Sequence, residues 1–228
     1  MVNLASVAFD TCVNSGDFGS HSPDVDDVAQ KAITTCIVDD AALRLHRYLW
    51  TPARYAHPQW LASLGFSPKG SWRYGEYPPL DRSLNLALQR RRGTPRLPAQ
   101  LSDRQRRMAK MVSNINVFVL AIGLLKLECN DYFLLPDYRQ LILRWLDETL
   151  IWQLFGLCQG KNRAVFSPSE MIDNAFTLGI AVLHRAAQED AVLYAMLITL
   201  PPCKRALWPS IPRLAMNLLE RTLCAKYR

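Results

Sequence analysis

The sequence predicts an all-α protein, an irregular helical bundle with a loop-rich N-terminal third. Glycine is scarce, with 10 among 228 residues, while leucine and alanine are common, and this composition favours helices over a turn-rich β fold. Strand-like alternation of useful length is absent, whereas the second half of the chain repeats apolar residues at helical spacing. Half of the residues are hydrophobic and 21% are charged, which is typical of a globular protein with a substantial core.

Composition along the chain also predicts its domain organisation. Residues 1–21 are small, polar and poorly patterned, and we expect them to be flexible. Residues 22–228 should then form a single helical domain. A finer division of that domain into an N-terminal subdomain, 22–100, and a helical core, 101–228, is compatible with the same pattern.

Four helices are predicted in the first half of the chain, each with a boundary signal. Ser22 can cap the segment 22–38, and Pro23 and three aspartates follow it, which suits the positive end of a helix dipole. The other three segments are 41–49, with Arg44 and Arg47 away from the face of Leu45 and Leu49; 58–64, ended by Gly65; and 80–92, ended by Gly93.

Longer helices are predicted in the second half. The clearest boundary is Ser167-Pro168-Glu170, which has the spacing of a capping box. The predicted segments are 102–128, capped by Ser102 and apolar on nearly all sides after Ile115; 136–156, started by Pro136 and ended near Gly156; 167–187; 191–200, ended by a proline pair; and an amphipathic final helix, 211–228.

The net charge of +7 is unevenly distributed along the chain. Residues 1–40 contain seven acidic residues and one lysine, a net charge of −6. Residues 82–110 contain nine basic residues against Asp103 alone, a net charge of +8. These two segments could serve different partners, or they could pair with each other.

The Arg-rich segment 82–110 has several interpretations. Phosphate neutralisation by Arg and Lys would suit nucleic acid, but the segment contains no Phe, Tyr or Trp on which bases could stack. An acidic protein surface or anionic lipid headgroups would serve equally well as partners. The plainest interpretation is a solvated charged loop and helix start, and we expect no nucleic acid partner.

Cysteine usage and hydropathy indicate a cytosolic protein without a membrane span. The six cysteines are scattered and none stands in a CxxC pair, so reduced thiols are favoured over a disulfide framework or a zinc site. The N-terminus lacks the basic and apolar regions of a secretory signal. The longest apolar run, 117–125, has nine residues, whereas a helix needs about 20 to cross a bilayer.

No motif in the sequence indicates catalysis, and we expect no catalytic residue, no cofactor and no metal site. A Walker loop, GxGxxG, HExxH, an EF-hand loop and a nucleophile elbow are all absent, although a triad of scattered residues is left open. Asp147 and Glu148 are adjacent on a helix, where neighbours point about 100° apart, so we interpret them as a solvated face. His184 lies near a helix end, where a cation would meet the negative end of the dipole.

The densest motif is "LWTPARYAHPQWLASLG", residues 49–65. It is too broken by prolines for one helix, and it could be a packed corner whose aromatic rings satisfy freed backbone groups. It could also present a docking surface, because Trp, Tyr and Arg dominate interface hot spots. The candidate partner-binding residues are Trp50, Pro52, Arg54, Tyr55, His57 and Trp60 of this motif, together with Arg90, Arg91 and Arg92.

The motif resembles the N-terminal signature of the YscK/SctK family, the accessory sorting-platform proteins of bacterial type III secretion systems. That signature has a hydrophobic residue, then Pro-Ala-x-Tyr-x-His, then a leucine, as Pro52, Tyr55, His57 and Leu61 stand here. Three later stretches are similar to the family in order and spacing: 119–150, 178–202 and 207–227. The acidic N-terminus and the Arg-rich segment depart from the family pattern.

The resemblance implies a non-catalytic adaptor. Members lie in the cytosol at the inner membrane, held there by protein partners without direct membrane insertion. They join an SctD-like inner-membrane ring protein to an SctQ-like pod protein of the sorting platform. The family occurs in pathogens, where it serves virulence, and in rhizobia, where it is linked to nodulation, and the Arg-rich composition suits a plant-associated source. The alternative is a helical nucleic-acid-binding or regulatory protein that uses residues 82–110.

Overall fold

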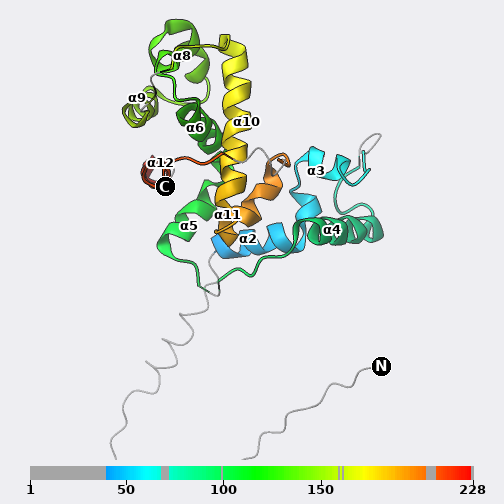
Figure 1. The fold of residues 1–228 in the computed structure, drawn as a ribbon. Coiled ribbons are helices and arrows are strands. Elements are labelled where there is room, and N and C mark those ends of the chain that lie inside the picture. Colours follow the sequence, from blue (N-terminus) through cyan, green and yellow to red (C-terminus); the bar gives the residue numbers. More distant parts are fainter. Residues whose placement is uncertain are drawn as a thin grey trace, which may run out of the picture. The chain divides into compact units, whose positions relative to one another are not determined.

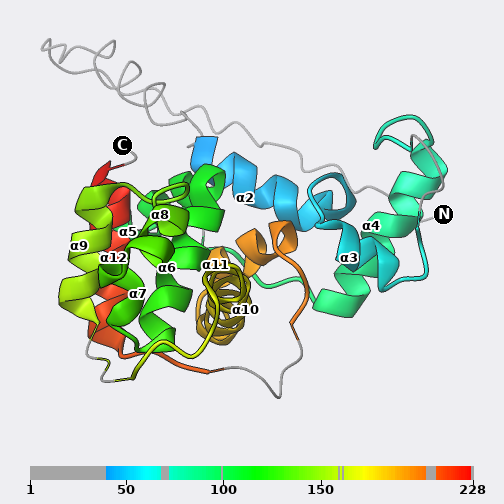
Figure 2. The ribbon, with the colours of Figure 1, turned by 90° about the horizontal axis from the view of Figure 1, so that it is seen from above.

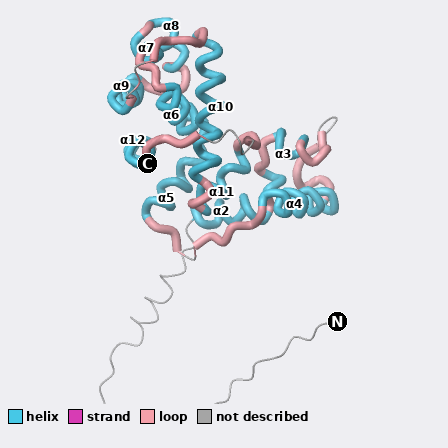
Figure 3. Tube along the Cα trace, viewed as in Figure 1, coloured by secondary structure: helices cyan, strands magenta, loops and turns pink. Residues whose placement is uncertain are grey.

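The computed structural model confirms the all-α fold class. It describes residues 40–67, 72–98, 100–158, 160, 162–203 and 209–226. In this part of the chain every regular element is an α-helix or a short 3₁₀-helix, and none is a strand (Figure 3). The chain divides into two units, Met1–Val38 and Asp39–Arg228. The predicted flexible segment 1–21 and the predicted helix 22–38 lie outside the described residues, and the finer division near residue 100 stays a prediction.

The helices of the described body are joined by connections of very different lengths (Figure 1). In chain order they are α2 (Asp40–Trp50), η2 (Pro52–Arg54), α3 (Pro58–Ala62), α4 (Pro78–Arg92), α5 (Asp103–Lys110), η3 (Met111–Asn114), α6 (Ile115–Leu127), α7 (Asp131–Leu134), α8 (Pro136–Ile142), α9 (Glu148–Leu157), α10 (Pro168–Ala186), α11 (Ala191–Met196), η4 (Leu197–Thr199) and α12 (Arg213–Lys226).

The centre of the fold is the packing of α6 against α10. Helix α6 is buried on almost every side, as its nearly continuous apolar sequence predicts, and α10, with 19 residues, is the longest helix among the described residues. Two glycines let the backbones approach closely. A Cβ on Gly123 of α6 would lie 1.7 Å from the carbonyl oxygen of Ala175, and one on Gly179 of α10 would lie 2.0 Å from that of Val119. Helices α8, α9, α11 and α12 contact this pair, whereas α3 and α4 lie to one side of it (Figure 2).

Most predicted helix boundaries are confirmed. Ser102 and Ser167 each begin a helix with a capping box, and the Glu170 carboxylate accepts hydrogen bonds from the backbone nitrogen and hydroxyl of Ser167 at 2.9 and 2.6 Å. Gly93 ends α4 with a φ of 82°, a backbone conformation that glycine adopts without steric cost. Helix α4 begins at Pro78, two residues before the predicted start.

The predicted helix 102–128 is not one regular helix. A 3₁₀ stretch, Met111–Asn114, separates α5 from α6. Ser113 and Asn114 are residues whose side chains compete for backbone hydrogen bonds and disfavour a helix interior. The segment Asp103–Leu127 includes an 18-residue window with a mean hydropathy of 1.7, sufficient for a membrane span, but 67% of this window is buried. Its apolar side chains are therefore already packed inside the protein.

The predicted helix 136–156 is also wrong as a single element. It starts at Pro136 as expected but ends at Ile142, and α9 begins at Glu148. Asp147 starts the second helix: its carboxylate accepts a hydrogen bond from Leu150 N at 2.8 Å and caps the N-terminus of α9. Asp147 and Glu148 are both exposed, as predicted, but Asp147 is the cap that precedes α9, and Glu148 pairs with Arg139 at 2.8 Å.

Candidate functional site

The candidate site is the motif corner, defined here as residues 49–65. Pro52 begins η2 and Pro58 begins α3, so each proline stands where its missing N–H costs no helical hydrogen bond. His57 precedes α3, and its Nδ1 accepts a hydrogen bond from Gln59 N at 3.3 Å. Pro52 and Leu61 are buried. Local sequence thus explains how the corner turns.

Polar side chains of α4 hold the corner on one side. The backbone nitrogen of Ala53 donates to Asn85 Oδ1 at 2.9 Å. Gln89 Nε2 donates to the carbonyl oxygens of Leu49 and Trp50 at 3.0 and 3.1 Å. These bonds satisfy backbone groups at the end of α2 and in η2 that have no helical partner.

The segment after α11 holds the corner on the other side. The backbone nitrogen of His57 donates to the carbonyl oxygen of Ile198 at 2.9 Å. The indole nitrogen of Trp60 donates to the carbonyl oxygen of Leu200 at 2.8 Å. These contacts join residues about 140 positions apart in the sequence, so the corner links the N-terminal helices to the C-terminal half.

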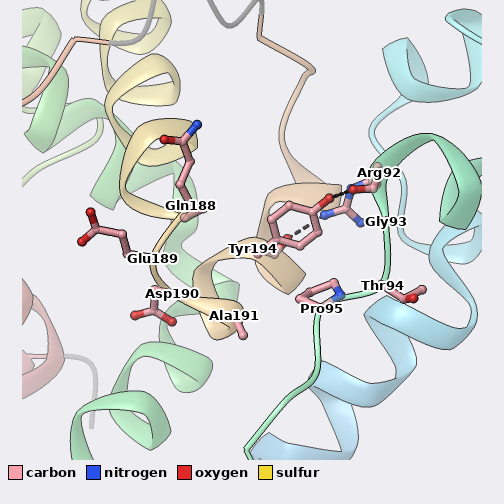
Figure 4. Close-up of a pocket in the computed structure, with 10 residues that line it drawn as sticks. Arg92, Gly93, Thr94, Pro95, Gln188, Glu189, Asp190, Ala191 and Tyr194 are labelled. Atoms are coloured by element: carbon pink, nitrogen blue, oxygen red, sulfur yellow. Dashed lines mark hydrogen bonds between the residues drawn. The ribbon is translucent and has the colours of Figure 1, made fainter.

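Arg92 fixes the corner to α11 through a reciprocal pair of hydrogen bonds. Its guanidinium donates to the carbonyl oxygen of Tyr194 at 2.6 Å, and the Tyr194 hydroxyl donates to the carbonyl oxygen of Arg92 (Figure 4). The guanidinium also lies over the rings of Trp60 and Tyr194, 5.5 and 5.0 Å from their centroids. Burial lowers the pKa of Arg92 to about 10, so Arg92 stays cationic at neutral pH and each ring faces a charge.

A cavity of about 680 Å³ lies beside this pair, between Arg92–Pro95 and the turn from α10 to α11 (Figure 4). Its acidic side chains already have partners. Asp190 caps α11 by accepting from Val192 N at 2.9 Å, and Glu189 pairs with Arg213 at 3.5 Å. Neither carboxylate is paired with a nucleophile or a histidine, so the cavity offers a polar recess and no arrangement that points to a reaction.

The structure divides the nine predicted site residues into two groups. The scaffold group is buried or partly buried and comprises Pro52, Tyr55, His57, Trp60 and Arg92. The surface group is exposed and comprises Trp50, Arg54, Arg90 and Arg91. Trp50 is 71% exposed, which is unusual for a side chain of this size.

Two members of the surface group, Arg54 and Arg91, contact residues of the motif corner. The Arg54 guanidinium lies 5.7 Å from the centroid of the Tyr55 ring, and that ring packs edge-on against Tyr48 at 4.8 Å. Arg91 donates to the carbonyl oxygen of Ser63 at 2.6 Å. The packed-corner and docking-surface interpretations are thus compatible in one structure.

Sequence reasoning did not find the residues that complete the site: Asn85, Gln89 and Tyr194. Each acts on a backbone group at least 32 positions away in the sequence. At such separations, no local sequence pattern indicates that these residues contact the motif. Polar side chains on the inward face of an amphipathic helix such as α4 are the nearest available sign, because such groups are usually hydrogen-bonded.

Other chemistry-bearing side chains have structural roles. His184 is buried, and burial lowers its pKa, which disfavours the cation expected at this helix end. Its Nε2 lies 3.2 Å from the carbonyl oxygen of Pro201, which can accept a hydrogen bond from it. Cys129 and Cys158 are buried free thiols, and burial raises the pKa of both. Within the described ranges, no group of three His, Cys, Asp or Glu side chains is placed to hold a metal ion.

The chain belongs to a family described as a type III secretion system subunit, which its sequence matches over residues 43–202. This range is more than two thirds of the chain and contains the entire motif corner, α4, α11 and the central pair α6 and α10. No curated protein and no solved structure gives a significant match.

Proposed function

We propose that this protein is a non-catalytic cytosolic adaptor of the type III secretion apparatus. It would link the cytoplasmic domain of an SctD-like inner-membrane ring protein to an SctQ-like pod protein, without a cofactor and without inserting into the membrane. The finer identity within the proposal is the YscK/SctK family, and its rhizobial, nodulation-associated branch is the suggested lineage. Family membership supports the role in secretion.

The observation that carries the proposal is the construction of the motif corner. The partly buried side chains of Trp60 and Arg92 hold the corner in place through hydrogen bonds to distant backbone carbonyls. The side chains of Trp50 and Arg54 are exposed to solvent. Trp and Arg are the residue types that contribute most to binding energy at protein interfaces. A rigid backbone lowers the entropy lost when such side chains bind. A corner built in this way suits an adaptor that presents a preformed surface.

The test is capture of the two named partners by the purified protein. We expect the wild-type chain to retain both the SctD cytoplasmic domain and SctQ, and the variant Trp50→Ala to lose one of them by roughly tenfold or more in affinity. The matched control is Tyr77→Ala, because Tyr77 is an aromatic residue 61% exposed outside the motif corner. Failure of the folded wild-type chain to bind either folded partner would overturn the proposal.

The nucleic-acid alternative has less support from the geometry. Arg92 and Arg104 of the Arg-rich segment make internal contacts, to Tyr194 and Glu220, so they are not free to neutralise phosphates. A titration with duplex DNA at increasing salt tests the alternative directly. Tight binding with a steep salt dependence would favour it.

A further inference from the structure

A groove lies on a part of the surface away from the motif corner. It consists of two adjoining cavities of about 590 and 250 Å³ that share Arg104 and Asn217 in their walls. Helix α5, the end of α10 and helix α12 form it. Figures 1 and 2 both place α12 on the opposite side of the described body from α3 and α4.

Arg104 holds the centre of the groove in place. Its Nε and Nη2 donate to the two carboxylate oxygens of Glu220 at 2.7 and 2.6 Å, and its Nη1 lies 3.5 Å from Asp190. Glu220 is 5% exposed, and its hydrogen bond raises the pKa of Arg104. This bidentate pair joins α5 to α12 and gives the groove a preformed shape.

The walls of the groove combine apolar side chains with uncompensated positive charge. Val182, Ile211 and Met216 line the larger cavity, and Met108 lines the smaller one. The rim carries the arginines Arg107, Arg185 and Arg221. Among the described residues these three make no ion pair, whereas the acidic residues of the groove are paired with Arg104 or Arg213.

We infer that this groove is a second docking site, and that its occupant is an acidic amphipathic helix of a protein partner. Apolar side chains on one face of such a helix would contact Val182, Ile211 and Met216 in the larger cavity, and flanking carboxylates would pair with the three rim arginines. The combined volume falls within the range of sites that bury apolar ligand groups. The inference rests on the proposed function only in taking the partner to be another subunit of the secretion apparatus.

The composition of the walls favours a helix over the two other anionic partners. Single-stranded nucleic acid needs aromatic platforms for its bases, and no Phe, Tyr or Trp lines either cavity. A membrane surface needs exposed apolar or basic groups on a convex face, whereas here the apolar side chains lie inside a recess. A peptide helix uses both the recess and the rim.

The experiment is a fluorescence anisotropy titration of the full chain with a labelled synthetic helix. The probe has about 18 residues, with leucines at positions i, i+3, i+4 and i+7 and glutamates on the flanks. We expect saturable binding that weakens about tenfold in the triple variant Arg107→Gln, Arg185→Gln, Arg221→Gln. A probe with lysines in place of the glutamates should bind at least tenfold more weakly to the wild-type chain.

A charge-matched control variant separates the groove from net charge. Arg82→Gln, Arg144→Gln, Arg163→Gln removes three exposed arginines that do not line the groove, and binding of the acidic probe should stay unchanged. Absence of probe binding, equal weakening in both triple variants, or preferential binding to duplex DNA or to phosphatidylserine vesicles would overturn the inference. The titration uses neither SctD nor SctQ, so its failure is distinct from failure of the partner capture.

Discussion

The backbone of Gly123 lies directly against the carbonyl group of Ala175. A Cβ at position 123 would come within 1.7 Å of that oxygen, and the partner glycine, Gly179, has the same relationship to Val119 at 2.0 Å. Both contacts are with backbone atoms, which cannot rotate away as a side chain could. The spacing between α6 and α10 therefore depends on two missing methyl groups.

We predict that Gly123→Ala or Gly179→Ala lowers the free energy of unfolding by about 3 kcal/mol or more. Overpacking a well-packed core costs typically 1–3 kcal/mol, and here two helices must separate. Gly156→Ala is the control, because Gly156 lies within α9 and a Cβ there meets nothing within 4 Å. It should raise stability by up to about 1 kcal/mol. Urea denaturation followed by circular dichroism measures all three, and equal stability of Gly123→Ala and wild type would contradict the prediction.

A second prediction concerns Tyr194 and Arg92. Replacing Tyr194 by Phe removes the hydroxyl that donates to the Arg92 carbonyl, and the unpaired carbonyl should cost about 1–2 kcal/mol of stability. Replacing Arg91 by Gln should cost less than about 0.5 kcal/mol, because Arg91 is an exposed surface residue. Thermal unfolding of both variants tests this contrast. A loss for Tyr194→Phe no larger than that for Arg91→Gln would contradict the role given to the Tyr194 hydroxyl.

Because Arg92 is held inside the protein and Arg90 and Arg91 are exposed, a test of partner binding should not replace all three arginines together. The three were grouped by sequence as one basic patch, but Arg92 is part of the scaffold. Replacing all three by Glu would bury a carboxylate against the Tyr194 carbonyl, which is unfavourable. Changing Arg90 and Arg91 alone isolates the surface. Circular dichroism should show native helicity for that pair and a loss of helicity for the triple variant.

Local signals in the sequence predict elements whose boundaries are made by neighbouring residues. The capping boxes at Ser102 and Ser167 and the ends of helices at Gly93 and Pro201 are of this kind. The break between α8 and α9 was not predicted, because its apolar spacing continues through Leu143 and Trp145 as if one helix persisted. Asp147 could have signalled it, since aspartate is a strong N-cap residue.

Contacts distant in sequence decide the rest. The motif 49–65 showed that a corner exists, but not that α4 and the residues after α11 would hold it. The Arg-rich segment gave a net charge, but nothing in its sequence separates Arg92 and Arg104, which are held by internal contacts, from Arg90. Whether an arginine of this segment is held inside the protein or exposed depends on Tyr194 and Glu220, which are at least 100 positions away in the sequence.

A further prediction concerns the pair Arg104 and Glu220. Replacing Glu220 by Gln removes a nearly buried carboxylate from two hydrogen bonds with Arg104. Because Arg104 is about half exposed to solvent, the loss should be about 1–2 kcal/mol, below the 3–5 kcal/mol of a fully buried pair. Chemical denaturation measures it, with Asp103→Asn as a control on the exposed pair Asp103–Arg106. The control should change stability by less than about 0.5 kcal/mol, and an equal effect would contradict the assignment of Glu220.

The last prediction is a dependence of stability on pH through His184. Burial lowers the pKa of His184 below its ordinary value of 6.5, and the charge of Arg92 acts in the same direction. The unfolded chain therefore binds a proton more readily than the folded one as the pH falls below about 6.5. The stability from neutral, buried His184 is complete above that pH and is lost progressively as the pH falls toward the lowered pKa of the folded state.

The variant His184→Gln should reduce this pH dependence. Glutamine keeps an N–H donor for the Pro201 carbonyl but does not titrate, so the slope of unfolding free energy between pH 7 and 5 should fall by up to about 1.4 kcal/mol per pH unit. His46→Gln is the control, because His46 is exposed on α2. Burial also lowers the pKa of His57, but both variants retain that residue, so the difference between them isolates His184. Identical slopes for the two variants would show that His184 is not held neutral by the fold.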